Sequence, residues 1–128
     1  MSIKLDALGI VVHDLGESLR FYRALGLPIP ELDLSEPHVE HVLPNGLRIM
    51  WDTVELVKGI DPHWVEPVGQ RMALAFLCSS PAEVDATYTQ VVASGFESKA
   101  EPFDAFWGQR YATVLDPEGN GVDLFAPL

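Results

Sequence analysis

Apolar and polar positions along the chain alternate in short blocks that predict strands and tight turns. The turns are marked by Asn45-Gly46 and by the dense turn sequence Asp116-Pro117-Glu118-Gly119-Asn120-Gly121. The pattern predicts strands in five segments: residues 4–12, 38–52 (a hairpin), 70–78, 96–103 and 106–128 (a second hairpin). Asp123 is the one charged residue in the apolar return strand of the last hairpin, and a carboxylate in that setting needs a polar partner.

Two segments have helical spacing and clear start signals. Asp14 and Ser80 are N-caps, and Glu17 and Glu83 follow three residues later to complete capping boxes. The predicted helices cover residues 15–25 and run from Pro81 to about residue 93. The remaining long segment, residues 53–69, contains prolines and glycines and predicts a loop, with a lid as one interpretation.

These elements occur twice in the same order. Adding 66 to Asp14, Glu17 and Tyr22 gives Ser80, Glu83 and Tyr88. The repeat predicts an α+β fold of two βαβββ modules, about residues 1–60 and 69–128. We expect a pseudo-twofold between them, a curved sheet facing inward and helices outside. At 128 residues the chain has the length of one domain.

Composition narrows the class of protein. Apolar residues make up 48% of the chain, which indicates a globular protein. The 19 acidic and 8 basic residues give a net charge of −11, which disfavours nucleic acid and anionic membranes as partners. No apolar run is long enough to span a membrane, and we see no secretory signal. The single cysteine, Cys78, excludes an internal disulfide and favours a cytoplasmic location.

Three stretches carry a family resemblance: LGIVVHDLGESLRFYRALGL, PNGLRIMWD and WGQRYATVLDPEGNGVDLFAPL. They resemble the vicinal oxygen chelate superfamily, which includes glyoxalase I, extradiol dioxygenases and bleomycin-resistance proteins. The resemblance covers nearly the whole chain, and the DPEGN turn is its most specific part. It implies paired modules that form a cup, commonly a homodimer, with a metal or a ligand inside.

The resemblance also implies four metal-ligand positions, which fall at Ala7, at Arg48 or Met50, at Arg71 and at Asp123. Alanine has no donor atom, the Met50 thioether is too soft for hard divalent ions, and arginine only donates hydrogen bonds. We therefore expect no metal and no cofactor. Asp123 is instead expected to pair with Arg71, with Arg48 or with both, and the alternative is an arginine left free to bind a substrate carboxylate or enolate.

Aromatic residues near the hairpins and the long loop suggest a small-molecule site. Trp51 is expected in the core, whereas Trp64 and Trp107 are the better candidates for lining a crevice. Histidines give a weaker signal, because His38 and His41 point to opposite faces of a strand. The candidate ligand-binding residues are Arg48, Met50, Trp64, Arg71, Trp107, Tyr111 and Asp123.

Three functions remain open from the sequence. The first is a metal-free protein that binds a small molecule and sequesters an antibiotic or another aromatic or cationic compound. The second is a divergent lyase, isomerase or dioxygenase-like enzyme of the same superfamily, with unknown catalytic residues. The third is a structural or regulatory domain without a small ligand.

Overall fold

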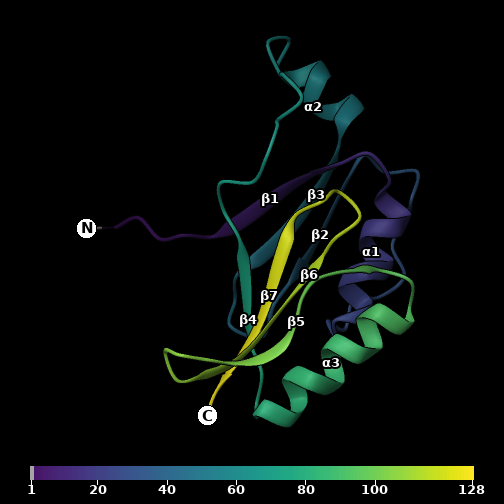
Figure 1. Cartoon of the computed structure of the whole chain (residues 1–128). Coiled ribbons are helices and arrows are strands. Elements are labelled where there is room, and N and C mark those ends of the chain that lie inside the picture. Colours follow the sequence, from purple (N-terminus) through teal and green to yellow (C-terminus); the bar gives the residue numbers. More distant parts are fainter. Residues whose placement is uncertain (1) are drawn as a thin grey trace.

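The computed structural model describes residues 2–128. The elements in chain order are β1 (Ala7–Val12), α1 (Leu15–Ala24), β2 (His38–Val42), β3 (Arg48–Thr53), α2 (Val54–Ile60), β4 (Leu74–Leu77), α3 (Pro81–Ala93), β5 (Glu97–Ala105), β6 (Gln109–Leu115) and β7 (Gly121–Pro127). Helices α1 and α3 lie on one side of the strands, and α2 lies apart from both (Figure 1). Every helix in this part of the chain is too short or too polar to cross a membrane.

The strands form two sheets of mixed direction. In the first sheet the order is β1-β3-β2, and in the second it is β4-β7-β6-β5. In each sheet the opening strand runs parallel to the last strand of its module, β1 to β3 and β4 to β7. The predicted α+β class and the repetition of its parts are confirmed.

The first module differs from the prediction in having three strands, among the described residues, instead of four. The connection from α1 to β2 contains Pro28, Pro30 and Pro37, and residues 27–37 form no strand. Proline has no N–H to donate to a ladder and fixes its own φ angle, so this segment pairs poorly with a sheet. The first module is therefore βαββ and the second is βαβββ.

The long segment predicted as a loop begins with a helix, which corrects the sequence interpretation. Thr53 is the N-cap of α2, and its hydroxyl accepts a hydrogen bond from the Leu56 amide at 3.2 Å. The helix has only seven residues and includes Gly59, so its pattern is too short to show a helical period. The strand predicted from residue 70 begins only at Leu74.

Gln70 explains why β4 begins at Leu74 and not at residue 70. Its side-chain amide donates to the Gly121 carbonyl at 3.0 Å, and its side-chain oxygen accepts from the Gly121 amide at 2.8 Å. The side chain thus takes the place of a strand backbone beside the start of β7. A sequence pattern does not distinguish this arrangement from a continuous strand.

The hydrophobic core includes residues from both modules. Tyr22 and Trp51 of the first module and Val91 and Val114 of the second belong to one cluster of buried side chains. Trp51 is fully buried, which confirms its predicted place in the core. The rings of Tyr22 and Trp51 lie 5.6 Å apart between centroids. Burial in this shared cluster packs the two modules against each other.

Asp116, the first residue of the DPEGN turn, connects the two modules. It is 4% exposed, and one carboxylate oxygen accepts the backbone amides of Glu118 and Asn120, each at 2.9 Å. The other oxygen accepts the Asn120 side-chain amide at 3.0 Å and the hydroxyl of Tyr22, in α1, at 2.9 Å. Burial raises the pKa of Tyr22 and the Asp116 charge raises it further, so the phenol stays a donor.

Candidate functional site

Four aromatic side chains line the face of the second sheet that points away from α3. We call Phe103, Trp107, Tyr111 and Phe125 the aromatic wall. Tyr111 lies between the other three: its ring centroid is 5.3 Å from Trp107, 6.2 Å from Phe103 and 6.4 Å from Phe125. Trp107 is 49% exposed and Phe103 is 41% exposed, so the wall has a surface free to meet a ligand.

Strand alternation places Asp123 beside this wall. Asp123 is opposite Thr113 in the β6–β7 ladder, and Tyr111 is opposite Phe125. The Tyr111 hydroxyl donates to Asp123 Oδ2 at 2.6 Å, and the Thr113 hydroxyl donates to Oδ1 at 2.7 Å. Each carboxylate oxygen therefore has one donor, and lone pairs remain on both.

The protonation of Tyr111 follows from its surroundings. Desolvation by burial, followed by the hydrogen bond and the charge of Asp123, raises the pKa of Tyr111 to about 12. The phenol therefore keeps its proton at neutral pH and donates to Asp123. Trp107 is fixed in turn by a 2.7 Å hydrogen bond from its ring N–H to the Gln109 side chain. The turn before β6 requires a positive φ, 89°, at Gly108.

The predicted pair between Asp123 and an arginine does not form. The Arg48 guanidinium donates to Asp6 and to Glu40, each at 2.8 Å. Arg71 is exposed and lies in the irregular segment before β4. Within residues 2–128, the partners of Asp123 are the hydroxyls of Tyr111 and Thr113. Two neutral hydroxyl donors thus take the place of the guanidinium expected from the sequence.

The remaining predicted positions lie on the first sheet. Ala7 is opposite Arg48, and Gly9 is opposite Met50. A Cβ atom at Gly9 would lie 3.7 Å from Met50 Cε, so the thioether occupies the space left by the glycine. With alanine, arginine and methionine at these positions, the donor set does not fit a hard divalent metal. No group of three His, Cys, Asp or Glu side chains in the described chain is placed to hold one.

A charged network on the first sheet was missed by the sequence interpretation. His38 Nδ1 lies 2.6 Å from Asp52 Oδ1, and His38 Nε2 lies 2.9 Å from Glu40 Oε2. Glu40 also binds Arg48. The hydrogen bond with Glu40, followed by that with Asp52, raises the pKa of His38. The turn residues alone would not have revealed this network. A two-residue Asn45-Gly46 loop would pair His38 with Thr53, whereas the observed loop pairs Leu43 with Leu47 and therefore His38 with Asp52.

Trp64 lies elsewhere, at a small pocket near the DPEGN turn. His13 and Glu118 line the same pocket. His13 Nδ1 lies 2.6 Å from Glu118 Oε1, and Nε2 lies 3.2 Å from Glu66 Oε2. The hydrogen bond with Glu118 raises the pKa of His13. Trp107 precedes β6 and Glu118 follows it, so Trp64 and Trp107 belong to opposite ends of the hairpin.

The α+β fold with two related modules can be compared with known protein families. The chain matches the model of the Glyoxalase/Bleomycin resistance protein/Dioxygenase superfamily over residues 4–124. It therefore belongs to that superfamily, which confirms the resemblance read from the sequence. No curated protein matches the chain.

Solved structures agree with this assignment. A glyoxalase/bleomycin resistance protein/dioxygenase from Nocardioides is 26% identical, with a TM-score of 0.79 over 100% of this chain and 85% of its own. A protein of unknown function from Agrobacterium tumefaciens is 27% identical, with a TM-score of 0.74 over 100% and 97%. A family enzyme from Burkholderia phytofirmans is 19% identical, with a TM-score of 0.84 over 98% and 100%, and shows likeness of fold alone.

Proposed function

We propose that this chain is a metal-free small-molecule-binding protein of the glyoxalase/bleomycin-resistance type. Its ligand is a planar aromatic cation, and its role is to sequester such a compound, an antibiotic among the candidates. One observation carries the proposal: a carboxylate, Asp123, lies within a partly exposed wall of aromatic rings.

The chemistry of this face supports a cation in particular. Flat rings stack on aromatic side chains, and a positive charge is attracted to their faces by about 0.5–2 kcal/mol. The Asp123 carboxylate supplies the opposite charge, and Tyr111 and Thr113 hold it in place from the sheet side. The net charge of −11 raises the local concentration of cations around the protein.

The metal-dependent alternative has less support. A lyase, isomerase or dioxygenase that depends on a bound metal needs three or more ligands around it. The corresponding positions hold Ala7, Arg48 or Met50, Arg71 and Asp123, and Arg48 is occupied by two carboxylates. The binding function accounts for Asp123 without needing the other positions.

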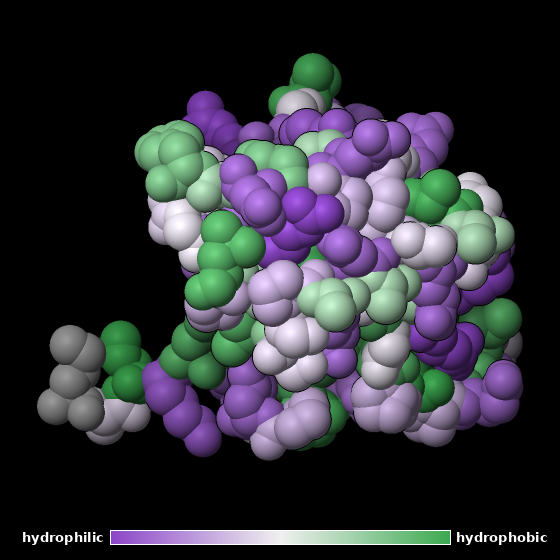
Figure 2. Space-filling view, turned by 60° about the horizontal axis from the view of Figure 1, so that its bottom comes forward, coloured by the Kyte–Doolittle hydropathy of each residue, from purple (hydrophilic) through white to green (hydrophobic). Residues whose placement is uncertain are grey.

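A homodimer and a cytoplasmic location belong to the same proposal. Phe106, which precedes the wall at the β5–β6 turn, is 97% exposed, and Leu77 of β4 is 68% exposed. Ile3 and Leu5, at 82% and 74% exposed, belong to the N-terminal segment that extends from the body in Figures 1 and 2. A second copy that covers such residues would remove apolar area from water. Light scattering of the purified protein tests the dimer directly.

Isothermal titration with ethidium, a planar aromatic cation, and with uncharged phenanthridine tests the ligand class. Asp123→Asn is expected to weaken ethidium binding about tenfold, equivalent to about 1.4 kcal/mol, and to leave phenanthridine binding unchanged. Trp107→Leu is expected to weaken both. Asp85→Asn is the matched control, because Asp85 is a carboxylate on α3 that pairs with Arg110.

Two results would contradict the proposal. One is a wild-type protein that binds neither compound. The other is an equal loss of ethidium affinity in Asp123→Asn and Asp85→Asn, which would mean that net charge alone attracts the cation. Metal analysis of the purified protein provides a separate check, since a stoichiometric divalent ion would favour the enzyme alternative.

A further inference from the structure

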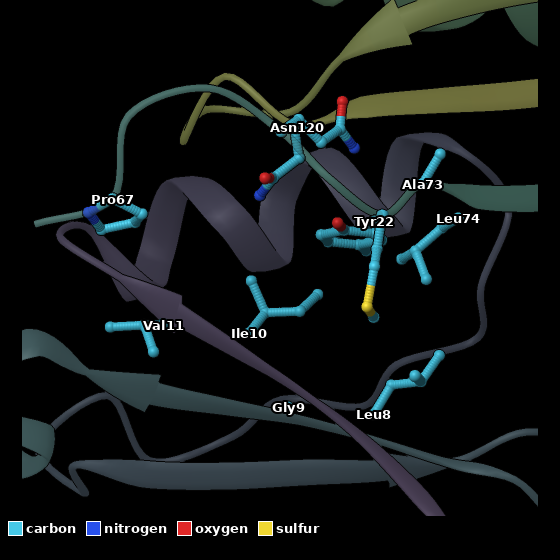
Figure 3. Close-up of a pocket in the computed structure, with 11 residues that line it drawn as sticks. Leu8, Gly9, Ile10, Val11, Tyr22, Pro67, Ala73, Leu74 and Asn120 are labelled. Carbon is cyan, nitrogen blue, oxygen red and sulfur yellow. The ribbon is translucent and has the colours of Figure 1, made fainter.

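A cavity of about 330 Å³ lies at the seam between the two sheets. Strand β1 is the edge of the first sheet and β4 is the edge of the second, and no ladder joins them in the described chain. Figure 3 shows side chains from β1, from α1 and from the segment before β4 around the same space. The lining is mainly apolar and includes Leu8, Ile10, Tyr22, Pro67, Ala73 and Leu74. Its volume is at the lower end of the range for small-molecule sites.

A second pocket, of about 180 Å³, adjoins this cavity and forms its polar mouth. The two share Val11, Pro67, Gln70 and Asn120 as lining residues. The mouth alone adds Trp64 and the group of His13, Glu66 and Glu118. The space is therefore amphipathic, with an apolar interior at one end and carboxylates beside an indole ring at the other.

The side-chain groups left over at the mouth are hydrogen-bond acceptors. Both polar atoms of the Gln70 amide are used by Gly121. The Asn120 side-chain N–H donates to Asp116, whereas its oxygen receives no hydrogen bond within residues 2–128. Glu66 uses one oxygen toward His13, and its side chain is 58% exposed. A ligand head group that fits here must donate hydrogen bonds.

We propose that the seam cavity binds an alkylammonium ion, with the alkyl chain among Leu8, Ile10 and Leu74 and the ammonium group at the mouth. The ammonium has three donors and no acceptor, which complements the free oxygens of Asn120 and Glu66. Trp64 lines the same mouth and offers an indole ring to the cation. Neither Asp123 nor the aromatic wall takes part, so this site is independent of the proposed function.

The charges around the mouth make binding depend on pH. His13 faces Glu118 from the β6–β7 turn and Glu66 from the segment after α2, and Lys58 approaches Trp64 from α2. With His13 protonated, the two carboxylates are offset by two cations. When His13 loses its proton, one negative charge is left over. Affinity for an alkylammonium ion is therefore expected to rise as the pH increases through the pKa of His13, which its glutamate partners raise.

Three eight-carbon probes with different head groups test this site by isothermal titration and thermal shift of the full chain. Octylammonium is expected to bind and to raise the melting temperature. 1-Octanol is expected to bind about tenfold more weakly, and octanoate not at all. Glu66→Gln is expected to reduce octylammonium affinity 3–10-fold and to leave octanol affinity unchanged.

Ala73→Trp tests whether the cavity itself is occupied. Ala73 is exposed yet lines the cavity, so an indole there fills the space without disturbing the core. This variant is expected to lose octylammonium binding while its unliganded melting temperature stays close to that of the wild type. Asp85→Asn is the matched control, because Asp85 on α3 lines neither the cavity nor its mouth, and it is expected to bind octylammonium normally.

Two outcomes would overturn the inference: similar affinities for octylammonium and octanoate, or full octylammonium binding by Ala73→Trp. If Ala73→Trp does not fold, the head-group series and Glu66→Gln still decide the question. Ethidium binding reports on the aromatic wall and octylammonium binding on the seam, so failure of one is distinguishable from failure of the other.

Discussion

The hydrogen bond from Tyr22 to Asp116 connects the two modules, and its removal tests how much this connection stabilises the fold. Tyr22→Phe deletes one hydroxyl and leaves the ring in the core, where it packs against Phe21 and Trp51. Packing is preserved, so the change in stability measures the hydrogen bond between α1 and the DPEGN turn.

The structure sets the expected magnitude. A buried hydrogen bond to a charged group contributes about 1.5–3 kcal/mol. Asp116 Oδ2 keeps the Asn120 side-chain amide after the substitution, so the carboxylate is not left without a partner. We therefore expect the lower part of this range, about 1.5–2 kcal/mol. For a chain of this size, that corresponds to a decrease in melting temperature of roughly 5–10 °C.

The internal repeat provides a matched control. Tyr88 occupies the equivalent position in α3, and its hydroxyl donates to the Ser98 hydroxyl at 2.6 Å in an exposed setting. Tyr88→Phe removes a neutral bond that water replaces easily, so its expected cost is about 0.5 kcal/mol. Urea unfolding of both variants gives the two free energies of unfolding, and equal slopes show that the unfolded states remain comparable.

A double-mutant cycle completes this test. Asp116→Asn alone is expected to destabilise more than Tyr22→Phe, because it weakens acceptors for two backbone amides as well. The cycle isolates the Tyr22–Asp116 coupling. A Tyr22→Phe cost no larger than that of Tyr88→Phe, together with a coupling near zero, would refute the idea that the turn connects the modules.

Three further predictions concern other contacts. Gln70→Ala is expected to lower the free energy of unfolding by about 1–2 kcal/mol, since two hydrogen bonds to Gly121 are lost. In the wild type, a Cβ atom at Gly121 would lie 3.0 Å from Gln70 Oε1. Gly121→Ala is therefore expected to destabilise Gln70→Ala less than it destabilises the wild type. Thr53→Ala is expected to speed amide exchange in α2 by removing its N-cap, at a cost of about 1 kcal/mol. The free energy of unfolding is expected to fall as the pH rises above 6.5, because the folded state raises the pKa of His13 and of His38 and binds more protons; replacing both by Gln should flatten the urea-derived pH profile.

The sequence by itself determined the class of fold and most of its elements. Capping boxes at Asp14 and Ser80 start α1 and α3, where each serves as N-cap to the Glu three residues later. These signals are local, since they depend on residues within one turn of helix or one hairpin. Strand alternation also puts Tyr111 and Thr113 on one face of β6, whereas the β6–β7 register that sets Asp123 beside them belongs to the structure.

Only the tertiary structure decided which donors the charged side chains contact and where a strand predicted from the sequence is interrupted. Asp123 accepts hydrogen bonds from hydroxyls and not from an arginine. The Gln70 side chain occupies the place of a strand backbone beside β7. Asp116 connects its turn to Tyr22 of α1, which lies 94 positions away in the sequence. A carboxylate can accept from a hydroxyl, an amide or a guanidinium, so its residue type leaves the donor open. Packing of the two modules decides which donors lie close to each carboxylate. These donors are far from the carboxylate in the sequence, so no local sequence pattern predicts them.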